Sequence, residues 1–307
     1  MSRIHEALRR AEQEQAQGHA PEESSPGAAG GVSPSLVAAR ESAGTSVRGT
    51  LGDPGAALLY EELSARCARP TWTVEPKIAQ LLNSAEGGVG SEELRTLRSR
   101  LYQIRDRQPL KKILITSALP EEGKTFLTAA LGHMIARQHG RRSLIIDTDL
   151  RHSQMHRLFG APVSPGLTDF LRGDADEYSI LQRGSASELF LIPGGKPASN
   201  PSELLANGRM KLLLDRLAPI FDWILVDSPP VVPIHDASVL ADFCDGVLLV
   251  IGAGTTPFDM AQKARGELKE KGLLGVVLNR VAASENYHQY YYNHYGQKNG
   301  SGSKKPH

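Results

Sequence analysis

The chain reads Ile113-Leu114-Ile115 and, two residues later, Ala118-Leu119-Pro120-Glu121-Glu122-Gly123-Lys124-Thr125. The apolar run predicts a buried strand. The second stretch fits the G-x-x-x-x-G-K-[ST] loop, which wraps phosphate groups with its backbone N–H groups. Ala118 stands at the first glycine position, and so small a residue still permits the tight approach. A helix that begins at Gly123 would point its positive end at the same phosphates. The sequence therefore predicts a nucleotide site where this strand ends.

The chemistry of this loop assigns roles to its residues. We expect Lys124 to reach the β- and γ-phosphates and the Thr125 hydroxyl to bind Mg²⁺. Glu121 and Glu122 place two negative charges in the loop, and we expect their side chains to face away from the phosphates. The residues expected to contact the nucleotide here are Ala118, Glu122, Gly123, Lys124, Thr125 and Phe126.

Apolar and helical stretches alternate from residue 112 to residue 281. Strands are predicted over 112–117, 143–147, 188–192, 223–227, 246–251 and 275–280, and helices over 123–138, 152–159, 166–172, 201–218, 235–242 and 257–271. Such alternation predicts an α/β fold of the P-loop NTPase type, in which helices cover both faces of a mostly parallel sheet. Ligands of such sheets lie at the carboxyl ends of the strands.

Two carboxylate signatures follow other predicted strands, Leu144-Ile145-Ile146-Asp147-Thr148-Asp149-Leu150-Arg151 and Ile224-Leu225-Val226-Asp227-Ser228-Pro229. If the chain stays extended, Asp147 and Asp149 lie on one face. We expect Asp147 to accept a proton from a hydroxyl nucleophile, and Asp149 and Asp227 to hold Mg²⁺. Lys124, Asp147 and Asp149 thus form the predicted catalytic set.

Two further polar residues lie near predicted strand ends. Arg151 would contact phosphate or order its own loop, and the sequence does not decide between these roles. Asn279 ends the last strand, where its amide would pair with the adenine edge or form a turn. We count both among the nucleotide-binding candidates.

Composition excludes other classes of protein. The 307 residues are 40% hydrophobic and carry a net charge of +1, so we expect a sizeable core and no nucleic-acid partner. The two cysteines are far apart, which favours a reducing compartment. The sequence predicts no membrane-spanning helix and no signal peptide.

The chain divides into four predicted regions. Residues 1–15 form a short amphipathic helix, residues 16–75 a disordered linker rich in Gly, Ala, Ser, Pro and Glu, residues 76–281 the P-loop domain, and residues 282–307 a flexible tail. The short helix is either solvated or a docking element for a partner or a membrane surface.

A charged stripe marks the helix predicted at 91–106, which we expect Ser91 to cap. Glu92, Arg95 and Arg98 lie on one exposed face of this helix. The stripe is either a solvated surface or an interface with a second copy of the chain. We expect the interface.

The tail contains five tyrosines within nine residues, Tyr287, Tyr290, Tyr291, Tyr292 and Tyr295. They follow the last predicted strand, so core packing does not explain them. A stacking platform for bases would need a basic groove, and a low-complexity or metal-binding tail is the other alternative. We expect these residues to be phosphoacceptors.

Together these motifs resemble the bacterial tyrosine kinases known as BY-kinases. The resemblance covers about residues 90–295, including D-x-D-x-R at 147–151, D-x-x-P at 227–230, E-x-x-R-x-x-R at 92–98, Asn-Pro-x-Glu-Leu-Leu at 200–205 and the tyrosine-rich tail. The opening residues 2–8 are similar to the start of exosortase-associated tyrosine autokinases.

The resemblance implies an ATP- and Mg²⁺-dependent autokinase that regulates polymerisation and export of exopolysaccharide or capsule. It implies a ring of subunits in which each tail is phosphorylated in a neighbour's site. It also implies a separate membrane chain-length-determinant protein as activator, and a cytoplasmic location at the inner face of the membrane through that partner. About −1.5 to −2 charges are added by each phosphotyrosine, so a modified ring would repel itself.

Two other functions fit the loop. A partner-switched ATPase of the Min or Par kind would carry a lysine where this chain has Leu119, and would leave the tyrosines unexplained. A nucleotide-binding scaffold without catalysis would not need the complete set of signature residues.

Overall fold

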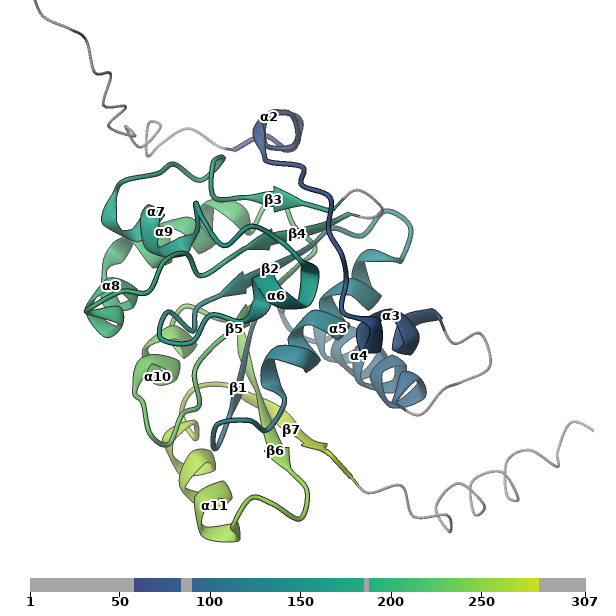
Figure 1. The fold of residues 1–307 in the computed structure, drawn as a ribbon. Coiled ribbons are helices and arrows are strands. Elements are labelled where there is room, and N and C mark those ends of the chain that lie inside the picture. Colours follow the sequence, from purple (N-terminus) through teal and green to yellow (C-terminus); the bar gives the residue numbers. More distant parts are fainter. Residues whose placement is uncertain (1–57, 84–89, 185–187, 282–307) are drawn as a thin grey trace, which may run out of the picture. The chain divides into compact units, whose positions relative to one another are not determined.

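The computed structural model describes residues 58–83, 90–184 and 188–281 (Figure 1). The predicted helix at 1–15, most of the predicted linker and the tail with its tyrosines lie outside these ranges. Within the described ranges, no helix combines the length and the apolar content that a membrane crossing requires.

Seven strands form a single sheet in the order β3-β4-β2-β5-β1-β6-β7. All neighbouring strands are parallel except β3 and β4, which are antiparallel. The bounds are β1 Lys112–Ser117, β2 Ser143–Asp147, β3 Gln182–Arg183, β4 Leu189–Ile192, β5 Trp223–Asp227, β6 Gly246–Gly252 and β7 Leu273–Asn279. The predicted parallel sheet is confirmed. The sequence analysis missed β3, because two residues are too short for a periodic signal.

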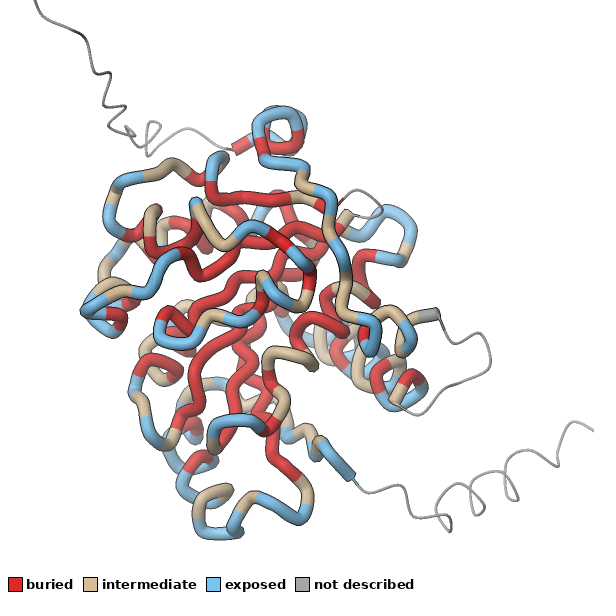
Figure 2. The backbone as a smooth tube through the Cα atoms, viewed as in Figure 1, coloured by how far each residue is buried: buried red, intermediate tan, exposed pale blue. Residues whose placement is uncertain are grey.

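Alternate side chains of the strands enter two separate cores, one on each face of the sheet. Leu114, Ile146 and Val226 lie in one core, whereas Ile115, Ile145 and Leu225 lie in the other. Both cores are fully buried along the central strands (Figure 2). Because both faces are covered, these strands read as continuous apolar runs in the sequence.

Helices cover both faces, as predicted. On one face, helix α5 packs against β1, β2 and β5, and α3 and α4 pack against α5. Helices α7 to α11 lie on the other face (Figure 1). The bounds are α2 Tyr60–Arg66, α3 Pro76–Asn83, α4 Ser91–Arg105, α5 Lys124–Ala136, α6 Met155–Phe159, α7 Leu167–Arg172, α8 Pro201–Ala206, α9 Gly208–Leu217, α10 Asp236–Ala241 and α11 Phe258–Glu267. The single helix expected at 201–218 is two helices, because Asn207 has an extended backbone and its side chain accepts a hydrogen bond from the Arg209 N–H.

The last part of the predicted linker is wrong. Residues 58–75 contain α2 and pack on the domain, and Leu63 of α2 is fully buried in the core. Farther along, the ring of Trp72 lies 5.1 Å from that of Phe159 in α6. A few large apolar residues in a stretch rich in small and polar ones are enough to bury it, and average composition hides them. Residues 58–75 are therefore part of the P-loop domain and not of a linker.

The start of α4 also differs from the expectation. The cap residue is Gly90, which has a left-handed backbone, and Ser91 is the buried first residue of the helix. The Glu93 carboxylate accepts the Gly90 N–H at 3.0 Å. The carboxylate of the first turn thus satisfies the N–H of the cap residue itself, as the glutamate of a capping box does.

Candidate active site

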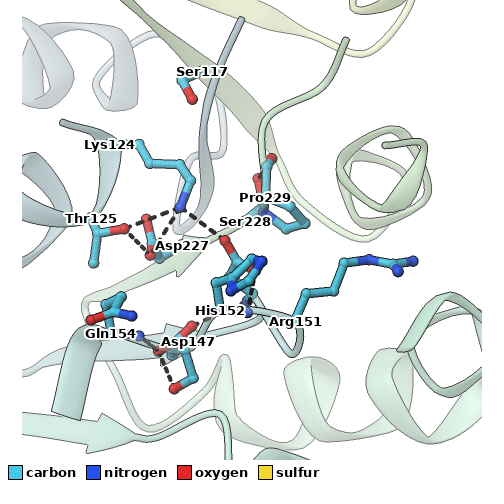
Figure 3. Close-up of polar contacts among 12 residues, drawn as sticks. Ser117, Lys124, Thr125, Asp147, Arg151, His152, Gln154, Asp227, Ser228 and Pro229 are labelled. Carbon is cyan, nitrogen blue, oxygen red and sulfur yellow. Dashed lines mark hydrogen bonds and ion pairs between the residues drawn. The ribbon is translucent and has the colours of Figure 1, made fainter. Parts of the chain in front are cut away.

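The three signatures meet where the central strands end. In the parallel register, Asp227 at the end of β5 is paired with Ile115 of β1 and with Asp147 of β2. The glycine-rich loop leaves β1 at the same edge and leads into α5. Strand order alone therefore brings a lysine and three aspartates to one place (Figure 3).

Lys124 is the centre of this cluster. Its Nζ lies 3.1 Å from Thr125 Oγ1, 3.2 Å from Asp149 Oδ2 and 3.8 Å from Asp227 Oδ2. Burial opposes the ammonium charge, but Asp227 and Asp149 outweigh burial and raise the pKa of Lys124. The Lys124 side chain is therefore a fixed positive charge where the loop leads into α5.

Asp227 is held from α5 by two hydroxyl groups. Thr125 Oγ1 donates to Asp227 Oδ2 at 2.8 Å, and Thr128 Oγ1 donates to Oδ1 at 3.2 Å. Burial raises the pKa of Asp227 although Lys124 acts against it. The sequence analysis did not single out Thr128. Its place one helical turn after Lys124, on the same face of α5, was the available signal.

The two aspartates of the D-x-D signature have different partners. Strand β2 ends at Asp147, so the extended stretch on which a shared face depended is not continued by the strand. Asp149 contacts Lys124, and its Oδ1 accepts the His152 N–H at 3.0 Å. Asp149 is 6% exposed, whereas Asp147 is fully buried.

Four donors surround the carboxylate of Asp147. Oδ2 accepts the Ser153 hydroxyl at 2.7 Å and the backbone N–H groups of Gln154 and Met155 at 3.2 and 3.1 Å, while Oδ1 accepts the Asp149 N–H at 3.1 Å. Burial and the nearby Asp227 raise the pKa of Asp147 to about 7. Asp147 thus ties the end of β2 to the start of α6.

The backbone of the loop is shaped at Gly123, the cap residue of α5. Its φ is 91°, and a Cβ atom there would lie 2.2 Å from Asn279 Nδ2. That amide donates to the Glu122 carbonyl at 2.8 Å. Asn279 therefore contacts the loop itself, a role that sequence reasoning did not anticipate.

The other predicted nucleotide contacts have varied surroundings. Ala118 is fully buried, and Phe126 packs against the core on the α5 face of the sheet. Arg151 donates to Asp236 at 3.3 Å and to Ser202 at 2.9 Å, and its side chain points away from Lys124 (Figure 3). Of the two roles left open for Arg151, these contacts favour ordering of its loop through α8 and α10.

The charged stripe of α4 lies outside this cluster. Glu92 is exposed and forms an ion pair with Arg95 three residues later. Arg98 is partly exposed on the same helix. These residues are placed as expected on the surface, and their role as an interface remains a prediction.

Known proteins are similar in sequence to about two thirds of the chain. The chain is 34% identical over 213 residues to the tyrosine-protein kinase YwqD of Bacillus subtilis, and the match covers 68% of this chain and 88% of that kinase. It belongs to the bacterial tyrosine kinases. The predicted family and the predicted enzyme class, a protein-tyrosine kinase, are therefore confirmed.

Further comparisons agree with this family. The kinase is 36% identical over 177 residues to the tyrosine-protein kinase CpsD of Streptococcus agalactiae serotype Ia, which covers 57% of this chain and 76% of the relative. The structure superimposes on the kinase domain of the Escherichia coli tyrosine kinase ETK with a TM-score of 0.62 and 30% identity, covering 67% of this chain and 82% of that one. No protein-family model matches the sequence.

Proposed function

We propose that this kinase transfers the γ-phosphoryl group of ATP to the tyrosines of the tail of another copy of the chain. The observation that carries the proposal is the position of Lys124 Nζ between Asp149 and Asp227, at the shared carboxyl ends of β1, β2 and β5. Phosphoryl transfer needs a positively charged group in contact with the phosphates, and beside it a carboxylate that orients the attacking hydroxyl. This cluster offers both.

The residues fit Mg-ATP. The loop amides and Lys124 suit phosphates, and the oxygens of Thr125 and Asp227 are the hard ligands that Mg²⁺ prefers. Thr125 Oγ1 and Asp227 Oδ2 already lie 2.8 Å apart. When bound, Mg²⁺ supplies charge neutralisation of the phosphates. The carboxylates and Lys124 hold one another in place.

The contacts favour Asp149 over Asp147 as the group that accepts the proton of the tyrosine. A base must come within hydrogen-bond reach of the phenol. Asp147 accepts four hydrogen bonds from its own chain and is fully buried, whereas Asp149 accepts two, one of them from Lys124. Asp149 lies beside Lys124 and retains some exposure. We therefore assign Asp147 a positioning role, which revises the assignment made from the sequence.

The tail starts next to the site. Asn279 contacts the phosphate loop, and Tyr287 and Tyr295 follow it by 8 and 16 residues. Extended chains of these lengths span at most about 29 and 58 Å. A tail can therefore reach beyond its own subunit, and the resemblance to ring-forming kinases favours a neighbour's site. The stripe of Glu92, Arg95 and Arg98 would supply the contact between subunits.

The cellular role follows from the resemblance. We propose that the kinase regulates polymerisation and export of an exopolysaccharide or capsule, with a separate membrane chain-length-determinant protein as activator. Addition of the cytoplasmic segment of such a protein should raise the rate of phosphotyrosine formation by the purified kinase. No change in that rate at saturating segment would refute the activator.

Mixing two variants tests transfer between copies. The full-length Lys124→Met chain serves as acceptor, and a chain in which Tyr287, Tyr290, Tyr291, Tyr292 and Tyr295 are all Phe serves as enzyme. With Mg-ATP, mass spectrometry should find phosphotyrosine on the acceptor tail only when both chains are present. An unmodified acceptor beside a wild-type chain that modifies itself would show transfer within one chain. Release of phosphate without any phosphotyrosine would favour the Min- or Par-like ATPase.

A further inference from the structure

Glu122 is a negative charge inside a loop that is built to bind phosphates. It directly precedes Gly123 and Lys124, and it is only 4% exposed. A buried carboxylate is costly unless donors surround it. The partners of Glu122 therefore decide what the residue does.

Those partners come from the phosphate loop itself and from the chain at the ends of β6 and β7. Within the loop, the Leu119 N–H donates to Glu122 Oε2 at 2.7 Å. The Gly252 N–H at the end of β6 donates to Oε1 at 3.1 Å, and the hydroxyl of Thr256, in the segment that leads to α11, donates to the same oxygen. The Glu122 carbonyl accepts the Asn279 amide from the end of β7. Four groups thus hold this one residue.

We propose that Glu122 is a positioning residue, which holds the phosphate loop in its binding shape by tying it to the β6–α11 segment and takes no part in holding nucleotide or metal. The inference rests on the proposed nucleotide site. Both carboxylate oxygens are directed at protein donors, so hydrogen bonds within the protein stabilise the negative charge. The tie also fixes Leu119 relative to Gly123, the two residues between which the loop curves.

Removing the charge of Glu122 distinguishes this positioning role from a purely electrostatic one, because the two predict opposite changes in nucleotide affinity. Glu122→Gln removes a negative charge near the phosphates, and by Coulomb's law alone that change strengthens nucleotide binding. If Glu122 instead acts as a brace, the link between the loop and the β6–α11 segment, the substitution weakens nucleotide binding. A glutamine must turn its NH₂ group either toward the Leu119 N–H or toward the Gly252 and Thr256 donors, so at least one contact is lost.

Isothermal titration calorimetry with ADP measures the effect on the full-length protein, with and without Mg²⁺. Glu122→Gln should weaken ADP binding about tenfold, the size expected for a lost hydrogen bond to a charged group. Thr256→Val should also weaken binding, and the double variant should be no weaker than Glu122→Gln alone, because both changes break one tie. Thr255→Val is the matched control, since Thr255 is the exposed neighbour. Its backbone N–H donates to the Gly252 carbonyl, which the substitution keeps, and its hydroxyl forms no hydrogen bond among the residues that the structure describes.

The loss should be equal with and without Mg²⁺, and in kinase assays it should appear in the KM for ATP more than in kcat. Tighter ADP binding by Glu122→Gln, or additive effects in the double variant, would overturn the proposal. A loss seen only with Mg²⁺ would also overturn it, because it would make Glu122 a metal ligand. Lys124→Met provides the separate test of the nucleotide site. If it leaves ADP affinity unchanged, the proposed site itself is wrong, whereas lost binding in Lys124→Met beside unchanged Glu122→Gln refutes only the brace.

Discussion

Substitution of Lys124 by Met should destabilise the fold as well as stop catalysis. Lys124 Nζ lies 3.2 Å from Asp149 and 3.8 Å from Asp227, and the lysine side chain is 11% exposed. At an effective dielectric constant of about 20, each such pair attracts by about 4–5 kcal/mol. The cost of burying the ammonium group removes several kcal/mol of that sum. We therefore expect the free energy of unfolding to fall by about 3 kcal/mol at pH 8.

The loss should depend on pH. Burial raises the pKa of Asp227, and removal of the lysine charge raises it further. A carboxyl group whose pKa is raised in the folded state takes up a proton as the pH falls, which relieves the uncompensated charge. The difference between variant and wild type should therefore be largest at pH 8 and smaller at pH 5.

Urea unfolding followed by circular dichroism at both pH values provides the assay, and the midpoint at pH 8 should fall by about 1 M. Lys112→Met is the control, because Lys112 forms a pair of the same 3.2 Å length with the more exposed Asp215 and should cost less than about 1 kcal/mol. Adding Asp149→Asn to Lys124→Met should recover part of the stability. Equal losses for both lysine variants, or no recovery, would refute the reasoning.

Three other substitutions test particular elements. Leu63→Ala should lower the free energy of unfolding by about 2–5 kcal/mol in urea titrations, because α2 is part of the core; an unchanged midpoint would return residues 58–75 to the linker. Gly123→Ala should weaken ADP binding in calorimetry, because its φ is 91° and the new Cβ meets Asn279, and Asn279→Ala in the same chain should restore part of the affinity. Asp147→Asn should flatten the pH dependence of stability. In the wild type, the pKa of Asp147 is raised to about 7. The protonated carboxyl group therefore contributes stability that is complete below about pH 4 and is lost as the pH rises through 7, with a slope of about 1.4 kcal/mol per pH unit. Equal slopes of stability against pH in both proteins would exclude this effect.

The sheet was predictable because its strands are buried on both faces. Runs such as Leu144-Ile145-Ile146 and Ile224-Leu225-Val226 have no polar alternation, and helical stretches of the right length separate them. Elements without that signal were either missed or expected only as a brief helix within the linker. β3 is two residues long, and α2 lies in a stretch whose composition is typical of a linker. Their burial depends on surfaces that the rest of the chain provides, and no local pattern records those surfaces.

The sequence by itself determined which chemical groups reach the site, because motifs at the ends of parallel strands must meet at one edge of the sheet. Lys124, Thr125, Asp149 and Asp227 lie together for that reason. The tertiary structure decided what each group faces. It turned Asp147 toward α6 and Arg151 toward Asp236. It also turned Glu122 toward Gly252 and Thr256, and Asn279 toward the phosphate loop. These partners are 7 to 157 residues away along the chain. Only the packed fold sets their distances, because a carboxylate or an amide binds whichever donor or acceptor the surrounding elements bring to it.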